Sequence, residues 1–381
     1  MVRRWSPAIW TGYNNINFDE LVMRQLFYQN LQPEIYATQS QGSSRLDVLN
    51  IVYAAFSFER EALHWPSKDN GGLTFKLDKI APANGFNDHD AHDALGDVRA
   101  TIFISKLIES RCPELWQNCV ACTNKSFVNS SIGNGKPISM VFRFGQSPPR
   151  EYNLVLAGRS WNDVNKVAVI DLNELEDTEE LNNFSPQNIS EMFNKSPKII
   201  RTFRVNSSPV VRRLENASRK LKLKADSVAN SPDFQNKVSD YITGEYKNEE
   251  SPSEIELKIY DGFSSEGDKE ILRRLTVLTW PERKKEIGKL SDPRLRKLGT
   301  RLLLLEEPTL LTVDQRLAGY EYFKGRWTNA RNDKRGWTTF GSVQKQLEDL
   351  FRLGLFSDQK KSDFDVFYST REEELKKAFG L

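Results

Sequence analysis

Residues 1 to about 113 alternate between stretches with a helical apolar stripe and short apolar runs. One such run, Ile9–Tyr13, predicts a strand that leads into a turn at Asn14 and Asn15. Helices are predicted at Phe18–Asn30, Arg45–Phe58, Leu73–Ala83 and Asp93–Arg111. The excess of helix over strand is unusual for an α/β domain, which needs a central sheet.

The pattern changes near Cys112, where a helix ends and a loop rich in Gly, Asn and Ser runs to Pro137. Five short runs follow in which residues alternate or are β-branched, separated by turn clusters such as QSPPRE and SWNDVN. The runs are ISMVFRF, YNLVLAG, KVAVIDL, KIIRTFRV and PVVRR. This pattern predicts a small antiparallel β-barrel.

Strand signals stop at Leu214, and the rest of the chain is helical. Helices run through Leu221–Ile242, and the acidic segment Asn248–Glu254, with Ser and Pro, indicates a boundary. We therefore predict three domains. They are an α/β domain at residues 1–113, a barrel with a helical extension at 114–252, and an all-helical domain at 253–381.

Composition restricts the class of protein. A chain of 381 residues is long enough for two or three domains with separate cores. The formal net charge is only +2, so a nucleic-acid partner must be met by a local groove rather than by a global field. Three cysteines exclude a disulfide framework and suit a reducing cytoplasm. No apolar run approaches ~20 residues, so we expect no membrane span.

The stretch Phe86–Ile104 carries two of the three histidines, interleaved with aspartates and followed by an amphipathic helical pattern. Asp93 and Asp97 lie one helical turn apart on one face, with His92 just ahead of them. A helix-borne carboxylate binds a hard cation and an imidazole accepts a proton from water, which suits metal-assisted hydrolysis. The alternative is that Asp93 caps the helix and the other acidic side chains are solvated.

A second acidic position, Asp19, follows an aromatic residue in GYNNINFDE, at the start of another predicted helix. Together the two stretches resemble the second and third motifs of the DEDD exonucleases, in their histidine-bearing, DnaQ-like branch. The order of GYNNINFDE, RLDVLNIV, HWP, GLTFKLDKIAPANG and AHDALGDVRATI resembles the bacterial exodeoxyribonuclease I family. YDGFSSEGD, at Tyr260–Asp268, looks like a further signature of that family, so the resemblance spans nearly the whole chain.

The resemblance implies a ribonuclease-H-like exonuclease domain, an SH3-like barrel and a C-terminal helical domain. It also implies that Asp19 and Asp97 are metal ligands and that His92 positions or deprotonates the attacking water. The complete site of the family uses two Mg²⁺ ions. His89, Asp93 and His64 are assigned structural roles.

The first motif of the family, an Asp-x-Glu on the first strand, has no counterpart here, because no carboxylate precedes Gly12. We therefore expect that the sequence lacks its natural N-terminus and that the exonuclease fold is truncated. Without the opening strands, the helices predicted at Phe18–Asn30 and Asp93–Arg111 have little sheet to cover. Their apolar faces are then expected to be exposed.

The function that the resemblance implies is 3′–5′ removal of nucleotides from single-stranded DNA, in DNA repair and recombination. Lys76 falls where the family carries a phosphate-contacting base, and Phe75 and Arg24 are further candidates for substrate contacts. Expected partners of a cytoplasmic monomer are single-stranded DNA and the acidic tail of single-stranded-DNA-binding protein. Two alternatives stay open: an inactive chain that only binds single strands or repair proteins, and another DnaQ-like nuclease acting on RNA or in proofreading.

Overall fold

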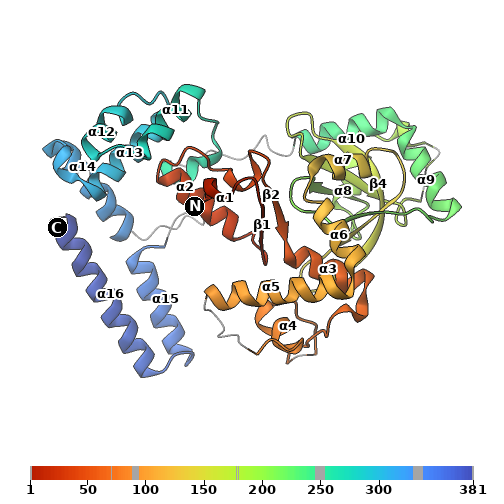
Figure 1. Cartoon of the computed structure of the whole chain (residues 1–381), viewed down its shortest axis with the longest axis horizontal. Coiled ribbons are helices and arrows are strands. Elements are labelled where there is room, and N and C mark those ends of the chain that lie inside the picture. The colour runs from red at the N-terminus through yellow and green to blue at the C-terminus, as the bar shows by residue number, and fades with distance from the viewer. Residues whose placement is uncertain are drawn as a thin grey trace. The chain divides into compact units, whose positions relative to one another are not determined.

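The computed structural model describes residues 2–69, 71–87, 94–176, 178, 180–244, 254–328 and 338–379. The chain divides into two compact units, each continuous in space but not in sequence (Figure 1). The first unit comprises Met1–Arg24 and Tyr36–Glu249, and the second comprises Gln25–Ile35 and Glu250–Leu381. The three predicted domains stay a prediction. No helix among the described residues is long and apolar enough to cross a membrane.

After a short helix, α1 (Val2–Trp5), the first unit forms a two-stranded parallel sheet. Strand β1, Ile9–Gly12, pairs with β2, Ser44–Asp47, so that Gly12 lies opposite Asp47. The predicted strand at residues 9–13 is thus confirmed, and the predicted helix at 18–30 is α2, Asp19–Gln29. The helix predicted from residue 45 is wrong at its start, because residues 44–47 pair with β1. Helix α3, Val48–Phe58, begins only after Asp47, whose side chain accepts a hydrogen bond from the Leu49 N–H.

Four further helices follow α3 before the large sheet begins. They are α4 (Leu77–Ala83), α5 (Ala94–Arg111), α6 (Pro113–Ala121) and α7 (Lys125–Ile132). Helix α4 starts four residues later than predicted, because Leu73 forms an antiparallel bridge with Ser67. The break predicted from Cys112 to Pro137 is also wrong over most of its length. Pro113 starts α6, and Asn124 caps α7 by accepting from the Ser126 N–H.

Helix α3 lies at the centre of the core in this part of the unit. Its residues Ile51, Val52 and Ala55 are fully buried, and they belong to one apolar cluster with residues of α4, α5 and α6. By contrast, Phe18, Val22, Val98 and Ile102 are each about half exposed or more. The prediction that apolar residues of the helices predicted at 18–30 and 93–111 are exposed is confirmed at these four positions, although Ile104 and Ile108 of α5 are buried in the core.

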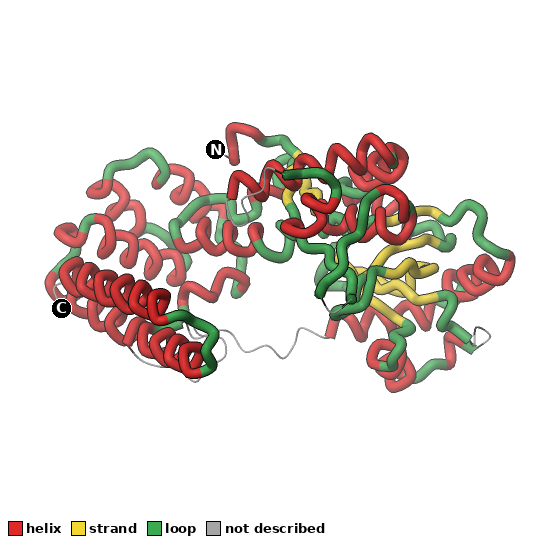
Figure 2. The backbone as a smooth tube through the Cα atoms, turned by 90° about the horizontal axis from the view of Figure 1, so that it is seen from below, coloured by secondary structure: helices red, strands yellow, loops and turns green. Residues whose placement is uncertain are grey.

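The five predicted strands are confirmed as one antiparallel sheet of order β6-β5-β4-β3-β7. Strands are drawn in yellow in Figure 2. The strands are β3 (Ile138–Phe142), β4 (Arg150–Arg159), β5 (Lys166–Asp171), β6 (Ile200–Arg204) and β7 (Val211–Arg213). Among the described residues, β6 and β7 pair with inner strands only and not with each other. They are therefore the edges of the sheet.

Helices pack on both faces of this sheet. One face carries α8 (Pro186–Asn194), α9 (Arg219–Ala229) and α10 (Pro232–Gly244), which share an apolar cluster with β4 and β5. The opposite face packs on α7, through Val128 and Ile132. Helix α10 approaches β4 so closely that a Cβ at Gly158 would lie 2.9 Å from the Val238 side chain. Glycine is therefore required there.

The second unit is helical. Its α-helices are α11 (Glu266–Leu275), α12 (Trp280–Ile287), α13 (Pro293–Glu306), α14 (Val313–Thr328), α15 (Phe340–Arg352) and α16 (Asp358–Phe379). The end of α2 belongs to this core, because Tyr28 is buried there and its hydroxyl donates to the Ile255 carbonyl at 3.0 Å. The fold is therefore mixed α/β with a helical portion.

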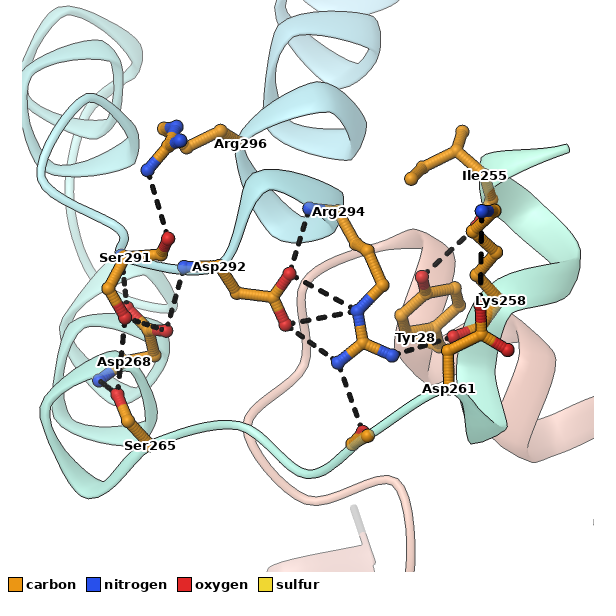
Figure 3. Close-up of polar contacts among 11 residues, drawn as sticks. Tyr28, Ile255, Lys258, Asp261, Ser265, Asp268, Ser291, Asp292, Arg294 and Arg296 are labelled. Atoms are coloured by element: carbon orange, nitrogen blue, oxygen red, sulfur yellow. Dashed lines mark hydrogen bonds and ion pairs between the residues drawn. The ribbon is translucent and has the colours of Figure 1, made fainter. Parts of the chain in front are cut away.

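The YDGFSSEGD motif builds a junction in this unit (Figure 3). The buried carboxylate of Asp268 accepts from the Ser291 N–H and hydroxyl, each at 2.7 Å, and from the Asp292 N–H at 3.1 Å. Arg294 in turn donates to the carboxylate of Asp292 and to the Gly262 carbonyl. The motif therefore has a structural function, because it joins the start of α11 to the start of α13.

We expect that replacing Asp268 by Ala lowers the free energy of unfolding of the second unit by about 1–3 kcal/mol, because two backbone N–H groups and a hydroxyl lose their buried acceptor. Urea denaturation followed by tryptophan fluorescence measures the change. Glu270→Ala, at an exposed position of the same helix, is the control and should change stability little. Equal stability of the two variants would contradict the role given to Asp268.

Candidate functional site

A cavity of about 1170 Å³ lies in the first unit. Its walls come from the end of β1 and the loop after it, the first turns of α2 and α5, the segment before α4, and the loop after β3. The lining includes Gly12, Asn14, Phe18, Asp19, Tyr53, Lys68, Phe75, Lys76, Asp97, Val98 and Arg143. Segments more than 130 positions apart in the sequence, such as those with Gly12 and Arg143, therefore share one surface.

The loop after β1 has a fixed shape. Asn14 adopts a positive φ of 60°, and a Cβ at Gly12 would lie 2.8 Å from the Cβ of Asn15. The carboxylate of Asp47 accepts from the N–H groups of Asn14 at 2.8 Å and Ile16 at 3.4 Å. Glycine and asparagine are thus needed at their positions, and the loop leads directly into the first turn of α2.

The first turn of α2 is held by Glu20, which lines the same cavity but is only 2% exposed. Its carboxylate accepts from the Thr38 hydroxyl at 3.0 Å and from the guanidinium groups of Arg24 and Arg45, each at 3.1 Å. Because Glu20 is anchored, its neighbour Asp19 is left exposed on the cavity side. Sequence reasoning missed Glu20, although an acidic residue four positions before Arg24 is a usable signal.

The predicted metal ligands Asp19 and Asp97 line the same cavity, each in the first turn of its helix, where a carboxylate is favoured by the helix dipole. His92 lies outside the described residues, as do His89 and Asp93. His64 does not line the cavity; its backbone exchanges hydrogen bonds with the Asn84 side chain. The structure thus brings together the two predicted carboxylates that it describes.

The predicted substrate contacts are placed differently from one another. Lys76 is exposed and lines the cavity, as expected of a phosphate contact. Phe75 also lines it, but its ring is 3% exposed and packs edge-on against Tyr53 and Phe56 at 5.3 and 5.0 Å between centroids. Arg24 is not among the lining residues, and Glu20 holds its guanidinium.

The buried carboxylate of Asp47 has a shifted pKa. Burial raises the pKa of Asp47 above 3.8, while hydrogen bonds from the N–H groups of Asn14, Leu49 and Ile16 partly offset that shift. The nearby negative charge of Asp19 raises it further. The pKa of Tyr13, whose hydroxyl donates to the Phe75 carbonyl, is raised well above its ordinary value, chiefly by burial.

The acidic side chains that line the cavity are candidate ligands for a divalent cation. Carboxylate oxygens are the ligands that Mg²⁺ prefers, and Asp19 and Asp97 supply two such groups. Among residues that the structure describes, however, no group of three or more His, Cys, Asp or Glu side chains is close enough to hold a metal ion. The described residues therefore supply two carboxylates to the cavity and do not by themselves form a two-metal site.

Comparison with known proteins identifies the relatives of this chain, although no protein-family model matches it. It is 29% identical over 290 residues to exodeoxyribonuclease I of Haemophilus influenzae, covering 69% of this chain and 61% of the relative. It is 28% identical over 304 residues to exodeoxyribonuclease I of Buchnera aphidicola from Schizaphis graminum, covering 75% and 62%. This chain is similar to exodeoxyribonuclease I. It spans about three fifths of the length of these relatives.

Solved structures of exonuclease I have the same fold. The enzyme from Methylocaldum szegediense matches with a TM-score of 0.81 at 23% identity, covering 99% of this chain and 82% of that one. E. coli exonuclease I in complex with a dA16 oligonucleotide matches with a TM-score of 0.77 at 22% identity, covering 97% and 81%. The mixed α/β architecture with a helical portion is therefore that of the exonuclease I homologues.

We expect that Asp47→Ala lowers stability by about 1–3 kcal/mol, because the N–H groups of Asn14 and Leu49 lose their acceptor. Chemical denaturation measures the loss, and Asp69→Ala, at an exposed position, is the control. Asp47→Asn, which keeps one acceptor, should lie between Ala and wild type. If Asp47→Ala were as stable as the control, the carboxylate would not hold the loop.

The raised pKa of Asp47 also gives a pH dependence. The folded chain binds the Asp47 proton more tightly than the unfolded chain, so this linkage stabilises the fold fully below pH 3.8. The contribution is lost as pH rises through the raised pKa. The stability of wild type relative to Asp47→Asn should therefore decrease between about pH 3.5 and about pH 7, an interval that contains the titration of a carboxyl group with a raised pKa.

Proposed function

We propose that this chain acts as a 3′–5′ exodeoxyribonuclease that degrades single-stranded DNA to nucleoside 5′-monophosphates. The observation that carries the proposal is that one cavity is lined by the exposed carboxylates of Asp19 and Asp97, among other acidic side chains, together with the cations Lys68, Lys76 and Arg143. A cavity with these charges is suited to a phosphodiester, whose phosphate is anionic and whose hydrolysis is assisted by metal-bound carboxylates. The homology to exodeoxyribonuclease I supports this reaction class.

In this proposal Asp19 and Asp97 would hold a divalent cation, Mg²⁺ in keeping with its preference for carboxylate oxygens. The bound cation supplies a lowered pKa for water and stabilisation of charge on the phosphate oxygens. Lys76 neutralises a backbone phosphate, while His92 accepts the proton of the attacking water. The buried Glu20 keeps Asp19 in place at the start of α2.

The second candidate is a chain that binds single-stranded DNA or repair proteins without degrading DNA. The similarity to exodeoxyribonuclease I supports the degrading enzyme over this alternative. A protein partner is suggested by a solved structure titled as a complex of exonuclease I with the C-terminal part of single-stranded-DNA-binding protein. We propose the acidic tail of that protein as a partner of this chain.

We also propose that the five-stranded sheet is an SH3-like barrel. The chain is proposed to be cytoplasmic and monomeric and to act in DNA repair.

We expect that Asp97→Asn abolishes divalent-metal-dependent release of nucleotides while leaving the fold intact, because the substitution removes one anionic oxygen donor from the cavity. The shortening of a 5′-labelled single strand, with and without added Mg²⁺, measures the removal of nucleotides from its 3′ end. Glu109→Gln, an exposed position of the same helix α5, is the control. Near-normal release by Asp97→Asn would remove Asp97 from the site, and absence of release by wild type would favour the binding-only chain.

The second expectation concerns the substrate class. A duplex keeps its bases paired inside, whereas a single strand presents both phosphates and bases to a cavity with cations and apolar residues. We therefore expect a single strand to be degraded faster than a blunt duplex, and binding to weaken as salt rises. Equal digestion of the two substrates in parallel assays would contradict this specificity.

A further inference from the structure

Arg143 follows directly after β3, in the sheet-forming part of the chain, yet it lines the same cavity as Asp19 and Asp97. It is half-buried. No motif of the resemblance includes it, and more than 30 residues separate it from α5. Its presence there is consequently a property of the folded chain that the motifs did not indicate.

The guanidinium of Arg143 is held in one orientation. Its Nη1 donates to the Tyr53 hydroxyl at 2.9 Å, and its Nε donates to the Ser147 carbonyl at 3.2 Å. Its central carbon lies 5.4 Å from the centre of the Tyr53 ring and 5.0 Å from that of the Phe75 ring. Side-chain freedom is thus already lost before any ligand binds, which lowers the entropic cost of binding.

The charge of Arg143 has no carboxylate partner within the described part of the chain, in contrast to Arg24 and Arg45 on Glu20. A guanidinium carries five N–H donors in a planar fork, and the two bonds above leave Nη2 available. Lys68 lines the same cavity, and its ammonium group donates to the amide oxygen of Gln146, three residues after Arg143, at 2.7 Å. Two cations in one cavity, one of them preoriented, match an anion with several acceptor oxygens.

We propose that Arg143, with Lys68 beside it, binds a backbone phosphate of the single strand and positions that strand against Asp19 and Asp97. The proposal rests on the proposed function, because it assigns a substrate contact in the same cavity. The rings of Tyr53 and Phe75 pack against the guanidinium of Arg143 and orient it. The burial of Phe75 agrees with this role, since a ring packed into the core is a rigid support for a cation.

The test is the binding of a fluorescent oligodeoxythymidylate by the full chain in EDTA, measured by anisotropy at several salt concentrations. Arg143→Gln should weaken binding about tenfold or more, since a hydrogen-bonded charge is lost. The slope of log affinity against log salt should become smaller by about 0.7, the value for one phosphate contact on a single strand. Arg150→Gln, an exposed arginine of β4 outside the cavity, is the matched control.

Two further variants separate phosphate binding from a structural role. Arg143→Lys keeps the charge and loses the fork, so its salt slope should equal that of wild type while affinity falls. Tyr53→Phe removes one hydrogen-bond acceptor and should weaken binding less than Arg143→Gln. Thermal unfolding of each variant identifies any that do not fold, in which case Arg143→Lys decides.

The outcomes distinguish this inference from the proposed function. Wild-type affinity and salt slope in folded Arg143→Gln, or wild-type affinity in Arg143→Lys where Gln does not fold, would overturn the phosphate contact and leave the nuclease proposal intact. Absence of single-strand binding by wild type would instead overturn the proposed function itself.

Discussion

The carboxylate of Asp47 is the interaction on which the arrangement of the site depends. It ends β2, caps α3 at the Leu49 N–H, and accepts from two N–H groups of the loop after β1. One side chain therefore fixes the distance between the buried helix α3 and the loop that leads to Asp19. The cost of burying this charge is visible in its raised pKa, and the three backbone donors are what offset that cost.

Burial divides the acidic residues of the first unit by role. Asp47 and Glu20 are buried and fully engaged, the first with backbone N–H groups and the second with two guanidinium groups and a hydroxyl. Asp19 and Asp97 are exposed on the cavity. A carboxylate already saturated by donors is a poor ligand for a cation, whereas an exposed one exchanges water for metal at little cost. The two classes are thus distinguished by their partners, although all four residues lie at or near element boundaries.

The pattern of apolar residues predicted those helices and strands that are long enough to show a regular repeat. Helix α5 and the five strands of the sheet were found in this way, and the motif resemblance supplied Asp19, Asp97 and Lys76. Strand β2 was missed because it has four residues and pairs with a partner 35 positions away. Helices α6 and α7 were missed, and for α7 the reason is that its Ser- and Asn-rich sequence also suits a loop. Arg143 and Glu20 were not predicted as site residues, since their importance arises from contacts that only the folded chain creates.

The apolar residues on the cavity have an explanation in the kind of ligand that it suits. Phe18, Val98 and Ile102 are substantially exposed, yet they line the same cavity as the carboxylates and the cations. Exposed apolar surface is unfavourable in water, and a simple anion such as phosphate would not cover it. A nucleotide presents a phosphate together with an aromatic base, so it can contact a cation and an apolar wall at once. The cavity therefore suits a strand whose bases are unpaired better than either a duplex or a free anion.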